Sequence, residues 1–573
     1  MDPLWLNHYP ADVPRHIDTS GYSSLTDLID KSCIKYKERV AYISMGVSMT
    51  YGELDEYSCQ LAAWMQSQGI ARGARVAIMM PNILQYPITM YAALRAGYIV
   101  VNVNPLYTPR ELEHQLKDSG AQAIVILENF AHTLEQVISR TAIKRVVLTS
   151  LGDMLGLKGH LVNFVVQYIK KLVPHYVLPG ATRFSDALRQ GASLPFSRPQ
   201  IGYDDLAFLQ YTGGTTGIAK GAMLSHKNVL ANTLQAQAWN QPAIDQPFKV
   251  SPYTTVSALP LYHIYALTVC GLMALANGAT NLLIANPRDI PAFIKELSRN
   301  TIHCLPAVNT LYNALLNSPD FDKVDWSHLR IANAGGMSVH HAVAERWLAK
   351  TGTPIIEGYG LTEASPTVTC NPVTAKEYNG MIGLPLPDTE LSIRDDAGRE
   401  LPIGETGELC VRGPQIMVGY WNRPDETAQV MTADGFLKTG DIAVMDSRGY
   451  TRLVDRKKDL ILVSGFKVFP NELEDLMTQH PEVLEVAAIG IPDEHSGEVV
   501  KLFIVKRHSE TNEDSLREDI FAFCKEQLTG YKRPRQIEFR RELPKTAVGK
   551  ILRRELRDAE MAKSQQGKSA VNA

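Results

Sequence analysis

Residues 205–239 read DLAFLQYTGGTTGIAKGAMLSHKNVLANTLQAQAW, an apolar strand followed by a glycine-rich stretch and an amphipathic helix. The glycines let backbone N–H groups approach a polyanion, while threonine hydroxyls and Lys220 add donors and positive charge. Ser225 stands where its side chain can cap the helix. A mere surface turn would not require three threonines and a lysine at these offsets, so residues 211–221 are predicted to bind phosphate. No G-K-[ST] closes the stretch, which disfavours a P-loop kinase or ATPase.

Strand-like and helix-like segments alternate on both sides of this stretch, from about residue 24 to residue 440. RVAIMM (75–80) and AQAIVIL (121–127) are typical of buried strands, and HHAVAERWLAK (340–350) is typical of a helix. Such alternation indicates parallel sheets covered by helices. Between 380 and 455, short β segments with the turn signals DDAG and DSRG predict a smaller antiparallel unit.

The pattern of secondary-structure signals changes again at VDRKKDLILVSG (454–465). Beyond it, helix-like NELEDLMTQH, strand-like EVAAIGI and KLFIVKR, and a basic end segment predict a separate α+β domain of roughly 110 residues. We therefore place a hinge near 455–459. The polar end of the chain, MAKSQQGKSAVNA (561–573), is predicted to be disordered.

The composition indicates a globular enzyme. Hydrophobic residues at 45% and charged residues at 21% are ordinary values, and 573 residues suggest several compact units. A net charge of −3 gives no reason to expect nucleic acid as a partner. Seven cysteines without a C-x-x-C pair argue against a zinc site or a disulfide framework and for a reducing compartment. With neither a secretory signal nor an apolar run of about 18 residues, we expect a cytoplasmic enzyme without a membrane span.

Three further motifs carry side chains suited to a nucleotide. In IIEGYGLTEAS, an aromatic face can stack on a nucleobase, and Glu363 near a phosphate loop can hold Mg²⁺. In DGFLKTGDIAVMD, Asp441 follows a turn and can accept hydrogen bonds from both ribose hydroxyls. In ELPKTAVGKILRREL, Lys550 follows a glycine on a segment flexible enough to swing. Taken singly, Glu363 would be interpreted as a solvated loop carboxylate, Asp441 as a turn aspartate and Lys550 as a solvated lysine. Their occurrence together with the phosphate loop favours a role for them in nucleotide binding.

The segment KGHLVNFVVQYIKKLVPHYVLPG (158–180) spaces its apolar residues as a helix does, with lysines alongside. The apolar positions are Leu161, Phe164, Val165, Tyr168, Ile169, Leu172 and Val173. One interpretation is a helix packed on the main body. The other is an interfacial helix that contacts membrane lipid or the mouth of a lipid site. The pattern alone favours the first.

Together and in this order, YTGGTTGIAKG, GYGLTE, KTGDIA, VDRKKD and PKTAVGK resemble the adenylate-forming superfamily of acyl-CoA synthetases, luciferases and peptide-synthetase adenylation domains. The resemblance runs from about 24 to 558, and the joint occurrence of these motifs is highly specific. WLNHYPADVPRHID (5–18), VVNVNPLYTPRELEHQLKDSGA (100–121) and GYWNRPDET (419–427) look most like the bacterial long-chain fatty acid–CoA ligases. The segment 158–180 also has a counterpart there, which puts its two interpretations on an equal footing.

The resemblance implies an α/β fold in which residues 1–455 form a large AMP-binding domain. This domain would comprise two doubly wound α/β subdomains and a small β-barrel-like subdomain. A hinge at 456–459 would join it to a mobile, small α+β domain at 460–560, followed by the tail at 561–573. In this family the C-terminal domain rotates between two half-reactions, about a residue that corresponds to Lys458.

The implied activity is that of a long-chain fatty acid–CoA ligase, which activates fatty acids for routes such as β-oxidation. A fatty carboxylate attacks the α-phosphorus of MgATP to give acyl-adenylate and pyrophosphate, and the thiol of coenzyme A then displaces AMP. The first step needs positioning and charge neutralisation rather than covalent chemistry from the protein. ATP, coenzyme A and a fatty acid are the implied substrates, and Mg²⁺ is the implied cofactor.

Roles for individual residues also follow from the resemblance. The β- and γ-phosphates would be held by Tyr211, Thr212, Gly213, Gly214, Thr215, Thr216, Gly217 and Lys220. Mg²⁺ would be held by Thr215 and Glu363. Adenine would be seated by Gly335, Gly336, Gly358, Tyr359 and Thr362, and ribose by Asp441 and Arg456.

The remaining implied roles belong to the chemical steps. Lys550 would reach the α-phosphate and carboxylate oxygens during adenylation, and His263 in PLYHIYAL would lie near the carboxylate. A buried structural histidine is the alternative for His263. After domain rotation, Gly465 and Lys467 would line the pantetheine channel or approach the phosphate.

Two other functions stay open. The same chemistry could act on an aryl, medium-chain or branched acid, or pass the adenylate to a carrier protein. The chain could also be an inactive acyl- or nucleotide-binding protein, although every motif residue that activity requires is present. Chain-length preference follows from the resemblance alone. The sequence leaves the oligomeric state open, a homodimer included, and allows a peripheral location on the inner face of the cytoplasmic membrane.

Overall fold

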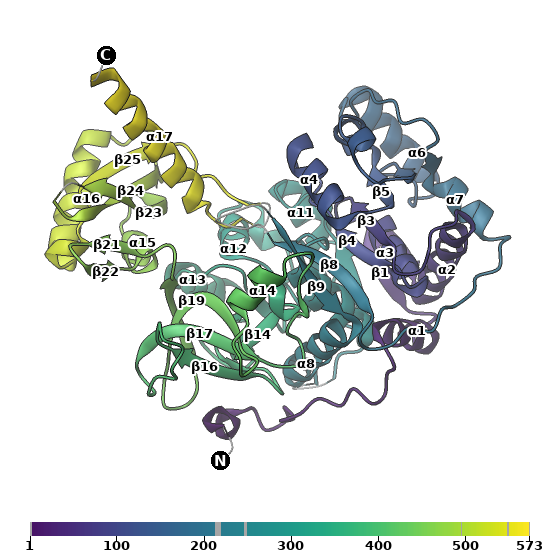
Figure 1. Cartoon of the computed structure of the whole chain (residues 1–573), viewed down its shortest axis with the longest axis horizontal. Helices are drawn as coiled ribbons and strands as arrows, with labels where there is room; N and C mark the ends of the chain where they lie inside the picture. The colour runs from purple at the N-terminus through teal and green to yellow at the C-terminus, as the bar shows by residue number, and fades with distance from the viewer. Residues whose placement is uncertain (1–2, 213–218, 246–248, 494, 547–548, 572–573) are drawn as a thin grey trace.

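The computed structural model describes residues 3–212, 219–245, 249–493, 495–546 and 549–571. A large body carries a small domain at its C-terminal end, and helix α17 (Arg553–Val571) extends outward from that small domain (Figure 1). Among all the described residues, no helix is both long enough and apolar enough to cross a membrane.

The largest sheet has eight strands in the order β18-β9-β8-β4-β3-β5-β6-β7. Its bounds are β3 Arg75–Met79, β4 Ile99–Asn102, β5 Ala123–Leu127, β6 Arg145–Thr149, β7 Thr182–Arg183, β8 Leu206–Thr212, β9 Lys220–Ser225 and β18 Gly419–Tyr420. Strands β3 to β8 run parallel, whereas β9 and β18 are antiparallel at one edge. The central strands β3, β4 and β5 are mostly apolar, as expected of parallel strands that helices cover on both faces.

The two faces of this sheet belong to separate cores. On one face, Val76 and Ile78 pack in the main core together with helix α3 (Gln85–Arg95). On the other, Ala77 and Met79 pack in a second core with helices α4 (Pro109–Ser119) and α5 (Ala131–Glu135). The alternation along β3 shows that its pleat points successive residues to opposite layers.

The glycine-rich stretch connects β8 to β9, which folds back antiparallel so that Thr212 lies opposite Lys220. Helix α8 (His226–Asp245) begins only after β9. The predicted cap is confirmed, because Oγ of Ser225 accepts the backbone N–H of Asn228 at 3.2 Å. The prediction that the helix directly follows the glycine-rich stretch was wrong, because strand β9 lies between them. Strand β9 escaped prediction because its sequence KGAMLS has too short an apolar run to mark a strand.

A second α/β unit contains the sheets β10-β11-β1-β2 and β12-β13-β14-β15. Isolated bridges at Cys304 link the two sheets, to Thr255 on one side and Ile331 on the other. The strands are β1 Val40–Ser44, β2 Val47–Thr50, β10 Thr254–Ser257, β11 Thr280–Leu283, β12 Ala332–Ala334, β13 Ile355–Gly360, β14 Thr367–Cys370 and β15 Leu384–Pro385. The main helices beside the two units are α1 Leu25–Lys35, α2 Tyr51–Ser67, α7 Phe184–Gly191, α11 Ile290–Leu297, α12 Asn309–Leu316 and α13 His341–Thr351. The α/β fold expected for the N-terminal domain is therefore confirmed.

The smaller antiparallel unit is a four-stranded sheet in the order β16-β17-β19-β20. Its strands are β16 Glu390–Arg394, β17 Thr406–Arg412, β19 Leu437–Met445 and β20 Thr451–Arg456. Helix α14 (Pro424–Val430) lies between β17 and β19 in the chain. The last strand brings the chain to the C-terminal domain.

The C-terminal domain is a five-stranded sheet with helices α15 (Pro470–Met477), α16 (Glu513–Gln527) and α17. Its strands are β21 Ile461–Val463, β22 Phe466–Val468, β23 Val483–Asp493, β24 Gly497–Lys506 and β25 Gln536–Arg540. Two separate apolar clusters cover the faces of this sheet, so the domain has its own core. The predicted α+β class is confirmed.

One predicted helix is shorter in the structure than the sequence pattern suggests. The helix expected over 158–180 is shorter, because α6 (Leu157–Phe164) runs into the π-helical turn η4 (Val165–Ile169) and ends there. Two features oppose a longer helix: Lys171 has a positive φ, and a proline follows at position 174. Helix α17 is described as far as Val571, within the segment expected to be a disordered tail.

Candidate active site

Asp441 on β19, an inner strand of the antiparallel sheet, is the centre of a polar cluster. The phenol of Tyr359, on β13, donates a 2.6 Å hydrogen bond to Asp441 Oδ2. Arg456, opposite Asp441 in the β19–β20 register, places Nε 3.2 Å from Oδ1. Burial and the Asp441 charge raise the pKa of Tyr359 well above its usual value, so the phenol remains a donor.

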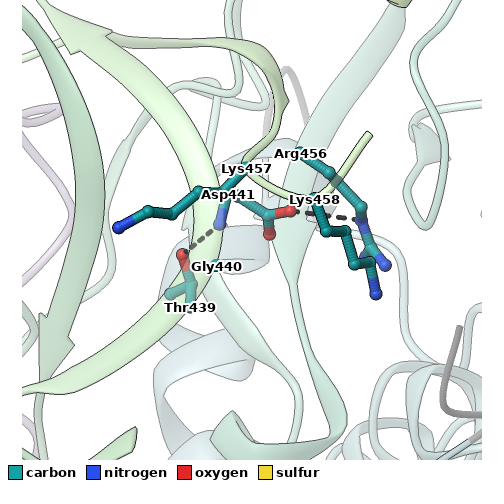
Figure 2. Close-up of a pocket in the computed structure, with 6 residues that line it drawn as sticks. All are labelled: Thr439, Gly440, Asp441, Arg456, Lys457 and Lys458. Carbon is teal, nitrogen blue, oxygen red and sulfur yellow. Dashed lines mark hydrogen bonds and ion pairs between the residues drawn. The ribbon is translucent and has the colours of Figure 1, made fainter. Parts of the chain in front are cut away.

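These residues border a pocket of about 320 Å³ lined by Thr439, Gly440, Asp441, Arg456, Lys457 and Lys458. Thr439 Oγ1 accepts the backbone N–H of Asp441 at 3.1 Å and fixes the turn. The side chains of Arg456 and Lys458 extend to one side of Asp441, whereas Lys457 points away (Figure 2). Lys457 instead pairs with Asp396 and Glu408. The predicted ribose residues are thus brought together, and the predicted hinge residue Lys458 lines the same pocket.

The predicted adenine glycines lie at close backbone approaches. Gly336 has φ +82°, and a Cβ there would lie 3.7 Å from Cε of Lys550. A Cβ at Gly335 would lie 3.1 Å from the ring of Tyr265, and one at Gly358 would lie 3.2 Å from the carbonyl oxygen of Thr369. A side chain at Gly335 or Gly358 would therefore crowd its neighbours. Thr362 opens the short 3₁₀ turn that carries Glu363.

Lys550 enters the site from the C-terminal domain. Its backbone N–H donates to Thr546 Oγ1 at 3.1 Å, and its carbonyl accepts the N–H of Thr546 at 2.8 Å. The preceding Gly549 has φ +83°, and a Cβ there would lie 2.7 Å from Oγ1 of Thr310 in the large domain. Burial and the nearby Arg456 lower the pKa of Lys550 to about 8, against the attraction of Asp441 and Glu363.

His263 lies close to Lys550 and also has a structural role. Burial and the Lys550 charge lower the pKa of His263 to about 4, so the imidazole is neutral near pH 7. Nδ1 accepts the backbone N–H of Tyr265 at 3.3 Å and caps the short helix α9 (Ile264–Ala266). Both interpretations of His263 therefore have a basis in the geometry.

The phosphate side of the site is described in part. Gly213, Gly214, Thr215, Thr216 and Gly217 lie outside the described residues. Thr212 and Lys220 are paired across the ends of β8 and β9. The Lys220 ammonium pairs with Glu426 and lies 5.1 Å from the ring centroid of Tyr420. Tyr211 is directed elsewhere, since its hydroxyl donates a 2.6 Å hydrogen bond to Asp118. Contact between Tyr211 and phosphate would have to come from its backbone.

Glu363 is held by the segment that follows β17. Its Oε1 accepts a 2.6 Å hydrogen bond from Tyr420, and its backbone carbonyl accepts the N–H of Met417 at 2.8 Å. The described residues contain no group of three or more histidine, cysteine or acidic side chains that could hold a metal. One carboxylate that shares the ion with substrate phosphates and water is nevertheless a donor set that suits Mg²⁺. The side chains present therefore fit a nucleotide-bound Mg²⁺.

Gly465 and Lys467 are not brought into this site. Both are exposed on the hairpin of β21 and β22, where Gly465 has φ +83°. Lys467 lies near Asp396 of the antiparallel sheet and helps to lower the pKa of that carboxyl. The structure therefore has Lys550 inside the site and the predicted thioester hairpin outside it.

Several functional candidates were missed in the sequence. Glu357 is 6% exposed, accepts a 2.8 Å hydrogen bond from Tyr378, and has its pKa raised to about 8 by burial, with Asp475 adding to the rise. Tyr420 and Glu426 stand in GYWNRPDET, which was noticed only for its resemblance. Nothing in the local pattern predicts that Tyr420 reaches a carboxylate 57 residues away.

The comparisons with known proteins agree with this geometry. The model of the AMP-binding enzyme family matches residues 29–421, and that of the AMP-binding enzyme C-terminal domain matches 472–550. The chain belongs to the AMP-binding enzyme family. It is 55% identical to the long-chain-fatty-acid–CoA ligase of Yersinia pestis, over 98% of this chain and 99% of that one. It is 54% identical to the long-chain-fatty-acid–CoA ligase of Escherichia coli O157:H7, over 97% and 98%.

A solved structure with the same fold is that of the anthranilate CoA ligase AuaEII in complex with anthranoyl-AMP. Its TM-score is 0.83 at 26% identity, and the match covers 95% of this chain and 98% of that one. The adenylate-forming resemblance and the two-domain α/β architecture are therefore confirmed.

Proposed function

We propose that this chain is an AMP-forming long-chain fatty acid–CoA ligase. The observation that carries the proposal is the position of Lys550, which reaches from the C-terminal domain to the Asp441–Arg456 cluster of the large domain. That convergence puts a cation from the C-terminal domain beside a nucleotide pocket, as acyl-adenylate formation needs. The identity to long-chain-fatty-acid–CoA ligases, at 51–55% over nearly the whole chain, supports the choice of acid.

The reaction has two balanced steps. A fatty carboxylate oxygen attacks the α-phosphorus of ATP, the bond to the bridging oxygen breaks, and pyrophosphate leaves. The thiol of coenzyme A then loses its proton and attacks the acyl carbon, and AMP leaves with the carboxylate oxygen. Neither step requires a covalent bond to the protein, so its contribution is orientation and charge.

The described side chains divide the first step between them. Asp441 binds the ribose hydroxyls, with Tyr359 and Arg456 fixing its carboxylate. Lys550 neutralises the charge that develops between carboxylate and α-phosphate. His263, neutral near pH 7, lies near Lys550 without adding a second positive charge. Lys220 exchanges Glu426 for the leaving pyrophosphate.

Mg²⁺ bound to the nucleotide would be held by Glu363 and, from outside the described residues, Thr215. When bound, it neutralises phosphate charge and helps the pyrophosphate to leave. Glu363 lies near enough to Lys550 to stabilise its positive charge, so the metal ligand and the swinging lysine belong to one site.

The second step requires a different arrangement of the domains. Gly465 and Lys467 lie outside the site while Lys550 occupies it. A rotation about the turn between Arg456 and Ile461, with Lys458 in it, would withdraw Lys550 and present the β21–β22 hairpin to the pantetheine arm. The same rotation accounts for the need to keep Lys550 on a separate domain.

We also propose that α6 and η4 contact an anionic membrane surface. Leu161, Phe164, Tyr168 and Ile169 are each more than half exposed. The opposite side is tied to the body, because Gly159 packs directly on Gly152 and Asn163 accepts the N–H of Gly152 at 2.7 Å. The segment between Asp153 and Asp186 carries lysines, histidines and an arginine but no acidic residue. An outward apolar face with basic neighbours is the pattern of an interfacial helix.

The choice of acid is tested by competition among substrates. The purified protein is incubated with MgATP, coenzyme A and acids of eight to eighteen carbons, and AMP release is followed. We expect kcat/KM to be highest for the long-chain acids. A higher kcat/KM for aromatic or short acids would contradict the long-chain assignment and leave the adenylate chemistry standing.

A further inference from the structure

Tyr420 joins the two groups that the proposed function assigns to the triphosphate and its metal. Its hydroxyl donates a 2.6 Å hydrogen bond to Glu363 Oε1, and its ring lies 5.1 Å below the ammonium of Lys220. The tyrosine is buried, with 8% of its surface exposed. An apolar ring such as phenylalanine would fill the same space. The hydroxyl of Tyr420 therefore has a role beyond packing.

The backbone around Tyr420 is fixed from three sides. Strand β18 pairs with β9, with Tyr420 opposite Ala222. The N–H of Tyr420 donates to Thr427 Oγ1 at 2.9 Å, and the N–H of Met417 donates to the carbonyl of Glu363 at 2.8 Å. The donor and its acceptor therefore belong to one rigid array rather than to two independent loops.

The hydrogen bond leaves one carboxylate oxygen for a ligand. Glu363 Oε1 is occupied by Tyr420, and no hydrogen bond or ion pair among the described residues involves Oε2. A carboxylate held by one oxygen has lost most of its rotational freedom before a cation arrives, which favours binding through the other oxygen.

We propose that Tyr420 is a positioning residue that orients Glu363 for the cation carried by the bound nucleotide. The proposal rests on the proposed function, which assigns Glu363 to Mg²⁺. It goes further by placing part of the metal affinity in a residue that touches neither metal nor nucleotide. The same ring gives Lys220 a fixed place beside the site, so the metal ligand and the phosphate lysine are set by one side chain.

The test compares two ligands by calorimetry. The magnesium complex of α,β-methylene-ATP needs both triphosphate and metal contacts, whereas AMP needs only the adenine and ribose contacts. Tyr420→Phe removes the hydroxyl and keeps the ring beside Lys220. We expect its Kd for the magnesium complex to rise about tenfold or more, in the range usual for lost outer-sphere partners, with the Kd for AMP unchanged. Tyr98→Phe is the matched control, because it also removes a buried hydroxyl that donates, at 3.0 Å, but to Ile70.

A double-mutant cycle with Glu363→Gln separates the outcomes. If Tyr420 acts through Glu363, the double variant binds the magnesium complex no more weakly than Glu363→Gln alone. Additive losses, equal losses for AMP, or wild-type binding by Tyr420→Phe would each overturn the positioning role. Wild-type binding by Glu363→Gln would instead remove the metal role from the proposed function itself.

Discussion

Tyr359 and Asp441 are joined by a 2.6 Å hydrogen bond between strands of two different sheets, 82 residues apart in the chain. The contact ties strand β13 to the antiparallel unit, and Arg456 completes it on the other carboxylate oxygen. Because both partners are buried, the pocket wall keeps its shape before a nucleotide binds.

Asp441→Asn should weaken nucleotide binding. The amide keeps the size of the carboxylate but loses its charge and half of its acceptor capacity toward ribose and Arg456. We expect the Kd for AMP, measured by calorimetry, to rise about tenfold or more. Asp446→Asn, at the far end of the same hairpin, where Asp446 pairs with Arg448, is the control and should bind AMP as the wild type does. Equal affinities in the two variants would contradict the ribose role.

Adenylation should weaken at alkaline pH. The pKa of Lys550 is lowered to about 8, so its positive charge is present below about pH 8 and is lost as pH rises through that value. kcat/KM for ATP reports the free enzyme, and it should fall above about pH 8 in proportion to the charged fraction. Lys550→Arg keeps its charge at every accessible pH and should lose this fall, whatever its absolute rate. A wild-type profile that stays flat between pH 7 and about 9.5 would remove the charge requirement.

Glu357 should make stability depend on pH. Its pKa is raised from 4.5 to about 8 in the folded chain, so the folded state holds a proton that the unfolded state has released. The free energy of unfolding therefore falls as pH rises from about 4.5 to about 8. The slope is at most about 1.4 kcal/mol per pH unit.

Glu357→Gln keeps an acceptor for Tyr378 and carries no titrating proton, so the drop in Tm between pH 5.5 and pH 8 should shrink. Glu390→Gln changes an exposed glutamate and should keep the wild-type drop. An unchanged drop in Glu357→Gln would show that Glu357 is already ionised in the folded chain.

Vesicle binding should depend on the outward face of α6 and η4. Phe164→Asp together with Ile169→Asp places charge on residues that are 53% and 65% exposed, so folding should be unaffected. We expect co-sedimentation with vesicles of anionic lipid to be lost and activity on a soluble acid to be retained. Ile403→Asp, at a site 49% exposed on another surface, serves as the control. Retained binding by the double variant would assign membrane contact to another surface or to none.

The sequence predicted the elements whose signals are local. Apolar runs such as 75–80 and 121–127 became β3 and β5 because both faces of a parallel sheet are buried. The site residues Asp441 and Arg456 could be paired in advance only through the resemblance, since their contact is a matter of strand register. The homodimer and the roles of Gly465 and Lys467 stay predictions.

The side-chain pairs that the sequence did not predict have a common physical cause. Tyr420 with Glu363, Lys220 with Glu426, and Tyr211 with Asp118 are all contacts between segments far apart in the chain. Periodicity and propensity describe only neighbours within a few residues, so such pairs leave no local pattern. The strand β9 and the end of the helix at Ile169 were missed for a different reason, because a short apolar run and a π-turn both blur the period on which the predictions depended.

Separating the two half-reactions tests the central claim most directly. Adenylation is measured as pyrophosphate release from MgATP and fatty acid, and thioester formation is measured as acyl-CoA production from supplied acyl-adenylate. Lys545→Ala is the matched control, because Lys545 is exposed in the same segment and pairs with Glu485. We expect Lys550→Ala to lose nearly all adenylation and to keep most of the thioester step, with Lys545→Ala close to wild type in both. An equal loss of both half-reactions in Lys550→Ala would contradict the account.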